Sequence, residues 1–159
     1  RRGMTLGTRM TDGAPEHLFP VRVYYEDTDA GGIVYYANYL KFAERARTEF
    51  LRSLGSEHHA MKEQHGVEFV VRSMEADYIR PARLDDELTV CSCLITLGGA
   101  SMTARQTVKR DDEDLVNLSV QLACVGAGGK PARMPGALRT ALKPFQHEQQ
   151  RGRICNKAS

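Results

Sequence analysis

Residues 21–51, VRVYYEDTDAGGIVYYANYLKFAERARTEFL, contain the transition that decides the fold. The β-branched and aromatic residues at positions 18–26 are typical of a strand, and the polar, glycine-containing run 27–32 ends it. Beyond that run, apolar residues recur at the spacing of one helical face. They are Tyr39, Ala43, Ala46, Phe50 and Leu54. We therefore expect an amphipathic helix packed on a sheet, with Asn38 as its N-cap and Gly55 at its C-terminal end.

The chain after this helix is predicted to consist mainly of strands, which follow a polar linker rich in histidine. Four runs have strand composition, and the glycine or acidic residues between them are typical of hairpins. They are residues 67–79, 87–97, 100–110 and 114–125. One strand, one long helix and an antiparallel meander together predict an α+β domain with the helix on one face of the sheet.

Length and composition indicate one globular domain. The 159 residues are 42% hydrophobic and 26% charged, which is enough to form a core. We expect the domain at residues 18–145, between a flexible N-terminal extension at 1–17 and a flexible tail at 146–159. The net charge of +2 favours neither nucleic acid nor membrane as a partner. No apolar run approaches the roughly 20 residues of a membrane span, so we expect a cytoplasmic protein.

The cysteines and histidines do not predict a metal site. Zinc sites need Cys or His pairs at ligand spacing, and Cys91-Ser92-Cys93 with scattered histidines does not supply them. We expect Cys91, Cys93 and Cys124 to be buried thiols in a reducing compartment. No metal and no cofactor is expected.

Three carboxylates, Glu26, Asp27 and Asp29, precede the glycine pair Gly31-Gly32. One interpretation is structural, because aspartate side chains accept hydrogen bonds from nearby backbone N–H groups in turns. The other is catalytic: a carboxylate facing a helix N-terminus, across glycines that let a ligand come close, has the minimum equipment for attack on an activated acyl group. A thioester suits such a site because its thiolate leaves easily. The residue types alone leave both interpretations open.

Five of the six tyrosines gather around this junction, at positions 24, 25, 35, 36 and 39. Core packing and interface burial explain most of them, because tyrosine joins an apolar ring to a polar tip. One or two of them are candidates for the lining of an acyl pocket.

The stretch 21–51 closely resembles the YbgC-like branch of the 4-hydroxybenzoyl-CoA thioesterase family, which is associated with the Tol-Pal system. The resemblance continues in FVVRSMEADYIRPARLDDELTV, residues 69–90, and in GKPARMP, residues 129–135. It covers nearly the whole chain between Phe19 and Pro135. Its core is Tyr-x-Asp-Thr-Asp-Ala-Gly-Gly, followed by Tyr, Asn-Tyr and Glu-Arg-Ala-Arg.

The resemblance implies a hotdog fold, in which the sheet wraps the long helix, and a homodimer or homotetramer with active sites at the dimer interface. It implies hydrolysis of acyl-CoA with Asp29 as nucleophile or general base. The Tyr36 backbone N–H, at the start of the helix, would polarise the thioester carbonyl, and Tyr25 matches an active-site tyrosine. Many YbgC-like members have histidine at position 36, where the 4-hydroxybenzoyl branch has tyrosine. The backbone N–H survives that change, whereas any role of an imidazole does not.

We expect the substrate to be bound by Gly31, Gly32, Ile33 and Val34. The expected substrate is a short to medium aliphatic acyl-CoA. The alternatives are an aromatic acyl-CoA, a thioester of acyl carrier protein, and a non-catalytic module that binds acyl-CoA. A hotdog dehydratase would require a catalytic histidine, and none is evident.

Overall fold

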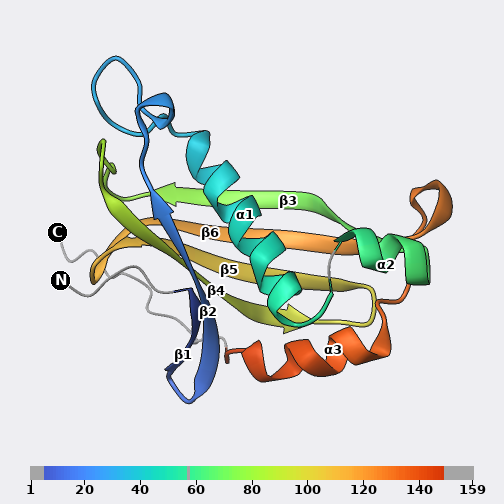
Figure 1. Ribbon diagram of the computed structural model, residues 1–159. Coiled ribbons are helices and arrows are strands. Elements are labelled where there is room, and N and C mark those ends of the chain that lie inside the picture. The colour runs from blue at the N-terminus through green and yellow to red at the C-terminus, as the bar shows by residue number, and fades with distance from the viewer. Residues whose placement is uncertain (1–5, 57, 149–159) are drawn as a thin grey trace, which may run out of the picture.

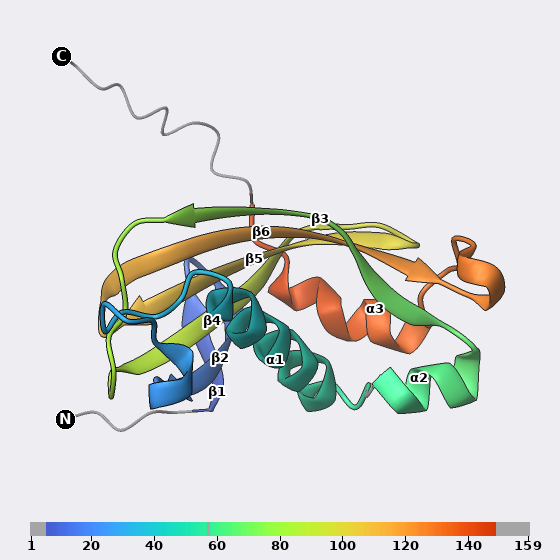
Figure 2. The ribbon, with the colours of Figure 1, turned by 90° about the horizontal axis from the view of Figure 1, so that it is seen from above.

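In the computed structural model, which describes residues 6–56 and 58–148, a six-stranded antiparallel sheet curves around one long helix (Figure 1). The strand order is β1-β2-β4-β5-β6-β3. The strands are β1 (Gly7–Thr11), β2 (Ala14–Arg22), β3 (Glu68–Tyr78), β4 (Glu87–Leu97), β5 (Ser101–Arg110) and β6 (Glu113–Val125). The helices are α1 (Asn38–Ser53), α2 (His58–His65) and α3 (Gly136–Leu142), and they share one side of the sheet (Figure 2). The predicted α+β hotdog architecture is confirmed.

Helix α1 is the element on which the sheet closes. Its predicted apolar face is buried, with Phe42, Ala43 and Ala46 each no more than 1% exposed. The predicted N-cap is wrong, because Ala37 occupies that position and Asn38 instead donates its side-chain N–H to the carbonyl of Asp27 at 2.9 Å. The amide of Asn38 therefore ties the start of α1 to the preceding loop.

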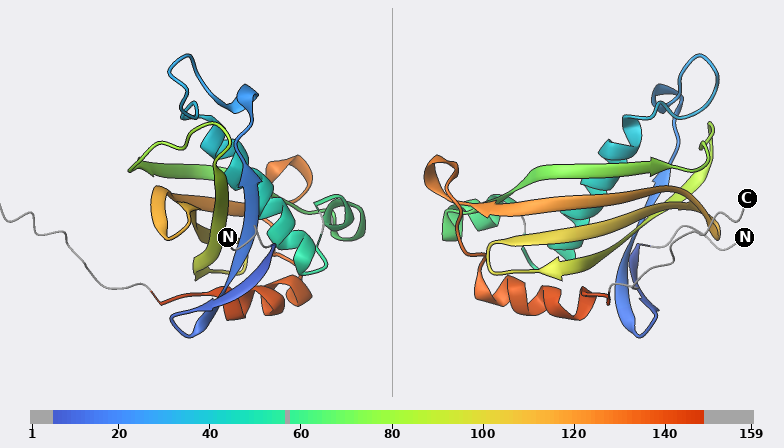
Figure 3. Two further views of the ribbon diagram at one scale, coloured as in Figure 1. Left: turned by 60° about the vertical axis from the view of Figure 1, so that its left-hand side comes forward. Right: turned by 180° about the vertical axis from the view of Figure 1, so that it is seen from behind.

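The predicted meander is confirmed for β4, β5 and β6, whereas β3 pairs with β6 instead of β4 and lies at one edge of the sheet (Figure 3). Within the described residues, strand β3 pairs with β6 alone. Four large apolar side chains on β3 or directly after it are between 39% and 47% exposed: Val70, Val71, Tyr78 and Ile79. The other edge strand is the short β1.

The expected flexible extension at residues 1–17 is wrong for the part that the structure describes, which begins at residue 6. Strands β1 and β2 form a hairpin, and β2 already starts at Ala14. An ion pair between Arg9 and Glu16 at 2.8 Å spans the hairpin, and His17 is buried to 1% exposure. Residues 1–5 lie outside the described residues. The last residues of the predicted first strand instead form a 3-10 turn, Tyr25–Asp27.

The segment predicted as a polar linker is a helix, a further helix that was not predicted follows β6, and the domain ends later than residue 145. Helix α2 replaces the expected linker and buries Met61, while α3 buries Leu138 and Leu142. His147 is buried as well, and its N–H donates to the carbonyl of Leu94 at 2.8 Å. Both helices are short, so the sequence offers too few turns for an apolar period to stand out. Residues 149–159 of the predicted tail lie outside the described residues.

Cys91, Cys93 and Cys124 are buried free thiols, as predicted. Burial raises the pKa of Cys91 to about 12. None of the helices within residues 6–56 and 58–148 is both long and apolar enough to cross a membrane.

Candidate active site

The segment between β2 and α1 forms a closed loop that projects beyond one end of α1 (Figure 3). A bridge between Thr28 and Val34 closes it, and Asp29 donates its N–H to the carbonyl of Ile33 at 2.9 Å. Gly32 returns its N–H to the carbonyl of Asp29 at 3.0 Å and has φ of 76°, a conformation that a side chain would strain. Asp29 is therefore held inside a loop of fixed shape.

One oxygen of the Asp29 carboxylate is tethered. The Gly31 N–H donates to Asp29 Oδ1 at 2.8 Å, and a Cβ on Gly31 would lie only 3.2 Å from that oxygen. Across residues 6–56 and 58–148, no other group hydrogen-bonds or ion-pairs with this carboxylate. The side chain is exposed in the single chain, so Oδ2 is available to a substrate or a water.

The neighbouring carboxylates differ from Asp29 in their contacts. Asp27 accepts the Tyr24 N–H on Oδ2 at 2.8 Å, and its carbonyl accepts the N–H of Tyr35 at 3.0 Å. The structural interpretation therefore describes Asp27, which closes the turn. Glu26 is exposed. Asp29 combines both interpretations, because it makes one local turn contact and leaves one oxygen unpaired.

Tyr36 lies two residues before α1 and brings a backbone donor to the same segment. Its N–H meets no acceptor in the described part of the chain, whereas its carbonyl accepts the Tyr78 hydroxyl at 3.3 Å. The positive end of the α1 dipole lies beside this N–H. An unpaired N–H at a helix N-terminus suits an oxyanion that develops on a substrate carbonyl.

Tyr25 is 83% exposed in the 3-10 turn. It makes no hydrogen bond to Asp29 in the single chain that the structure describes. Its assignment to the active site stays a prediction.

An apolar pocket of about 260 Å³ adjoins Tyr36. Ile33, Val34 and Tyr36 line it, whereas Gly31 and Gly32 do not. The remaining lining residues are Tyr39, Tyr78, Ile79, Arg80 and Pro81. The predicted binding segment is therefore split: Ile33 and Val34 face the pocket, and the two glycines shape the loop around Asp29.

Three aromatic rings form one wall of this pocket. The rings of Tyr36 and Tyr78 meet edge to face at 6.1 Å, and those of Tyr39 and Tyr78 lie 5.9 Å apart. Burial raises the pKa of both Tyr39 and Tyr78. Neutral phenols are thus favoured, so this wall carries no charge.

The loop between β3 and β4 braces the Asp29 loop. Val34 donates its N–H to the carbonyl of Ala82 at 2.9 Å, and Ile33 bridges to Arg83. The buried Ala82 N–H in turn donates to the hydroxyl of Tyr39 on α1 at 2.8 Å. One short loop therefore connects the candidate site to the central helix.

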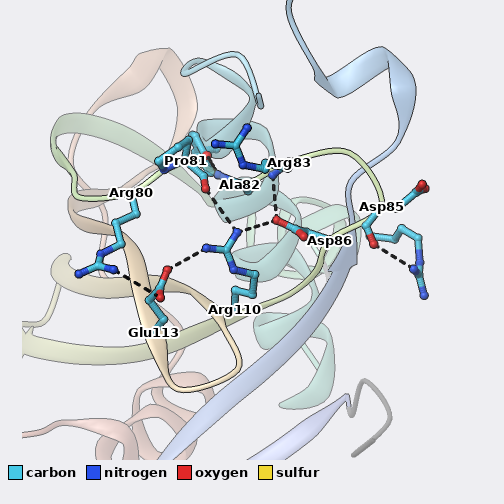
Figure 4. Close-up of polar contacts among 10 residues, drawn as sticks. Arg80, Pro81, Ala82, Arg83, Asp85, Asp86, Arg110 and Glu113 are labelled. Carbon is cyan, nitrogen blue, oxygen red and sulfur yellow. Dashed lines mark hydrogen bonds and ion pairs between the residues drawn. The ribbon is translucent and has the colours of Figure 1, made fainter. Parts of the chain in front are cut away.

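Arg110, at the end of β5, holds the bracing loop (Figure 4). It donates to Asp86 Oδ2 at 2.7 Å and to Glu113 Oε1 at 2.8 Å, and more weakly to the carbonyl of Pro81 at 3.4 Å. The Asp86 Oδ2 atom also accepts the N–H of Arg83 at 2.8 Å. The Asp86 carboxylate raises the pKa of Arg110. No spacing in the sequence marks Arg110, because its partners come from separate elements.

The described residues contain no group of three or more His, Cys, Asp or Glu that would hold a metal ion. The site consists of a carboxylate, a backbone donor and an apolar pocket. Such a set can support attack on an activated carbonyl without a resident cofactor.

Comparisons with known proteins agree with this chemistry. The thioesterase superfamily matches residues 31–117. The acyl-CoA thioesterase YbgC of Haemophilus influenzae is 44% identical over 125 residues, which cover 78% of this chain and 92% of that protein. The acyl-CoA thioester hydrolase YbgC of Escherichia coli O6:H1 is 42% identical over 131 residues, or 79% of this chain and 94% of the relative.

A solved structure, that of a probable thioesterase from Bartonella henselae, superposes with a TM-score of 0.71 at 39% identity. The superposition covers 76% of this chain and 99% of that protein. The chain belongs to the thioesterase superfamily.

Proposed function

We propose that this protein hydrolyses acyl-CoA thioesters to the free acid and coenzyme A, with short to medium aliphatic chains preferred. The observation that carries the proposal is the pairing of Asp29, with one unpaired oxygen, and the unpartnered Tyr36 N–H on one braced loop. Two YbgC relatives, named as an acyl-CoA thioesterase and an acyl-CoA thioester hydrolase, support the substrate class.

In the proposed reaction, Asp29 has one of two roles. As a nucleophile, its Oδ2 bonds to the thioester carbonyl carbon and the C–S bond breaks, so that the thiolate leaves with the electron pair. Water then hydrolyses the mixed anhydride. As a general base, Asp29 takes a proton from the water that attacks the same carbon. In both routes the Tyr36 N–H donates to the carbonyl oxygen as negative charge develops there.

Position 36 bears on substrate choice. Its phenol ring packs against Tyr78 instead of offering an imidazole to the reaction. In this proposal the Tyr36 side chain forms part of the pocket wall, and its backbone N–H stabilises the oxyanion. The aromatic wall is the observation that favours the second candidate, an aromatic acyl-CoA, because aryl groups stack on tyrosine rings.

We place the working site at an interface between two copies. Asp29 and Tyr36 are exposed in the single chain, although a reacting carbonyl is stabilised best where water is excluded. The edge strand β3 bears the exposed side chains Val70 and Val71, and an unpaired edge is a template for pairing with another chain. Pairing of two β3 strands would give a homodimer with the sites at its interface, and two dimers would give a tetramer.

The protein is proposed to act in the cytoplasm. The buried free thiols Cys91, Cys93 and Cys124 fit a reducing compartment.

The test of the proposed reaction is thiol release by the wild-type protein from a panel of aliphatic and aromatic acyl-CoA esters, with an acyl carrier protein thioester as a further arm. Turnover that is fastest on short to medium aliphatic esters supports the proposal. Faster turnover of aromatic esters, or of the carrier-protein thioester, would favour those alternatives. No turnover in any arm would favour a binding module and contradict hydrolysis.

Oxygen-18 labelling tests whether Asp29 acts as a nucleophile. A single turnover in water labelled with oxygen-18 places label in the Asp29 carboxylate if a mixed anhydride forms and water attacks its aspartyl carbon, a result that only the nucleophilic role gives. Label only in the released acid would contradict that route, because a general base, like water attack at the acyl carbon of an anhydride, puts the new oxygen in the acid. The peptide that contains Asp29, analysed by mass spectrometry, gives the answer.

A further inference from the structure

A second cavity lies away from Asp29 and Tyr36. It measures about 530 Å³ and lies between α1 and the sheet. That volume is within the range of roughly 300–1,000 Å³ that is typical of small-molecule sites. Its apolar wall includes Phe50, Leu51, Leu94, Met102, Ala104 and Leu122. No residue of the Asp29 loop lines it, so the proposed reaction leaves this cavity without a role.

The cavity also has a cation in its wall. Arg47 of α1 lines it and donates from Nη1 to Gln106 Oε1 at 2.9 Å. Gln106 is fully buried, and its Nε2 donates to the carbonyl of Ala43 and to Ser92 Oγ, both at 3.0 Å. These two bonds fix which end of the Gln106 amide faces Arg47. The guanidinium is therefore held in place by a buried network.

Arg47 forms no ion pair with any residue in the ranges 6–56 and 58–148. Among the described residues, no carboxylate lies within ion-pair distance of its guanidinium. The only acid that lines the cavity is Glu44, which is exposed and interacts with Arg47 at longer range. Burial lowers the pKa of Arg47, which reports the cost of keeping this charge out of water.

Apart from Glu44, the other polar side chains that line the cavity carry hydroxyl groups, which can donate. Ser92 lines the cavity, and its Oγ accepts from Gln106, which leaves the hydroxyl proton free to donate inside. Thr48 adds a second hydroxyl. A partly buried cation with hydroxyl donors beside an apolar wall is complementary to an acceptor-only, negatively charged group on an apolar chain.

We propose that this cavity binds a medium-chain carboxylate, whose head group pairs with Arg47 and Ser92 and whose chain lies along the apolar wall. Guanidinium groups bind carboxylates through two parallel hydrogen bonds, and Arg47 has donors left after its single bond to Gln106. A free carboxylate is also the product of the proposed reaction, so the cavity would retain product. That consequence rests on the proposed function, whereas the binding itself does not.

The experiment is calorimetric titration of decanoate, with decan-1-ol as the uncharged probe of equal chain length. Wild type and Asp29→Asn are expected to bind decanoate equally, because the cavity does not include Asp29. Arg47→Met should weaken decanoate binding by about tenfold or more through loss of charge-assisted hydrogen bonds, and should abolish the preference over decan-1-ol. Arg45→Met, at an exposed position of the same helix, is the matched control and should bind as wild type.

A second variant tests the chain-binding wall without touching the charge. Ala104→Leu fills the cavity and should reduce the binding of decanoate and decan-1-ol alike. Unchanged decanoate affinity in either Arg47→Met or Ala104→Leu would overturn the proposal, as would a wild-type protein that shows no saturable binding. Every readout is equilibrium binding, so a failure of the proposed hydrolysis would appear in the thiol-release panel and not here.

Discussion

Removing the side-chain charge of Arg110 should lower kcat strongly and lower the free energy of unfolding only modestly. Arg110 does not line the pocket next to Tyr36, yet it holds the loop that carries Ala82, and Ala82 holds Val34 and Tyr39. The perturbation is Arg110→Gln, which is shorter and uncharged. It removes the ion pairs with Asp86 and Glu113 and leaves the β5–β6 pairing in place.

The magnitude follows from the exposure of these ion pairs. The Arg110 side chain is 30% exposed, and its partners Asp86 and Glu113 are 23% and 39% exposed. Buried bonds of this kind contribute about 1.5–3 kcal/mol each, and exposed pairs contribute well under about 1 kcal/mol. We therefore expect a loss of about 1–2 kcal/mol, which lowers Tm by roughly 2–8 °C in a domain of this size.

The same substitution should lower kcat markedly even where the variant is fully folded. A small displacement of the Asp29 loop takes the carboxylate out of line with the substrate carbonyl, and misplacement by about 1 Å can cost on the order of a hundredfold in rate. We expect kcat on an acyl-CoA to fall at least about tenfold at a temperature where the variant is fully folded. Steady-state thiol release measures kcat, and circular dichroism measures Tm.

The matched control is Lys109→Gln. Lys109 precedes Arg110 on β5 and ion-pairs with Asp114 of β6 at 2.6 Å, and it makes no bond to the β3–β4 loop in the described part of the chain, so kcat should stay near the wild-type value. The reasoning is refuted if Arg110→Gln lowers Tm as expected while kcat is unchanged. In that case the bracing loop stabilises the fold without positioning Asp29.

Three further predictions concern single side chains. Gly31→Ala should lower kcat by about tenfold with little change in Tm, because the new Cβ would lie 3.2 Å from Asp29 Oδ1 and displace it; unchanged kcat would contradict this. Tyr39→Phe should destabilise the fold by about 1–3 kcal/mol in urea unfolding, because the buried Ala82 N–H loses its acceptor. Burial lowers the pKa of His17 below its ordinary 6.5, so the unfolded chain binds more protons in acid; stability present above pH 6.5 should be lost as the pH falls through the folded pKa. Compared in melts from about pH 8 to about pH 5, His17→Phe should lose less stability than wild type, and an equal loss would exclude His17 as the cause.

Local sequence patterns predicted the helices and strands that have a clear apolar periodicity or strand composition. The spacing of Tyr39, Ala43 and Ala46 was sufficient for α1, and strand composition was sufficient for β4, whose bounds agree with the predicted residues 87–97. The β1–β2 hairpin escaped prediction because Arg9 and its neighbours carry charge and glycine where an apolar alternation would be needed.

Candidate-site residues that lie close together in the sequence could be predicted from it. Residues that come together only through contacts between distant elements could not. Asp29 and Tyr36 lie on one motif, so the resemblance could assign both as candidates. Arg110 and Ala82 act through contacts between distant elements. The same holds for Arg47 and Gln106, which are 59 positions apart in sequence. No local spacing encodes such contacts, because they arise only when the sheet closes on α1.

The most direct test of the account compares kcat/KM for Asp29→Asn and Glu26→Gln on one acyl-CoA substrate of the wild-type protein. Each variant neutralises one exposed carboxylate of the same segment, so folding and local charge are matched. The account predicts that Asp29→Asn, still folded, loses activity by at least about a hundredfold, as expected for a nucleophile or general base, and that Glu26→Gln stays within about twofold of wild type. Equal activity of Asp29→Asn and wild type would contradict the assignment of Asp29 and with it the proposed mechanism.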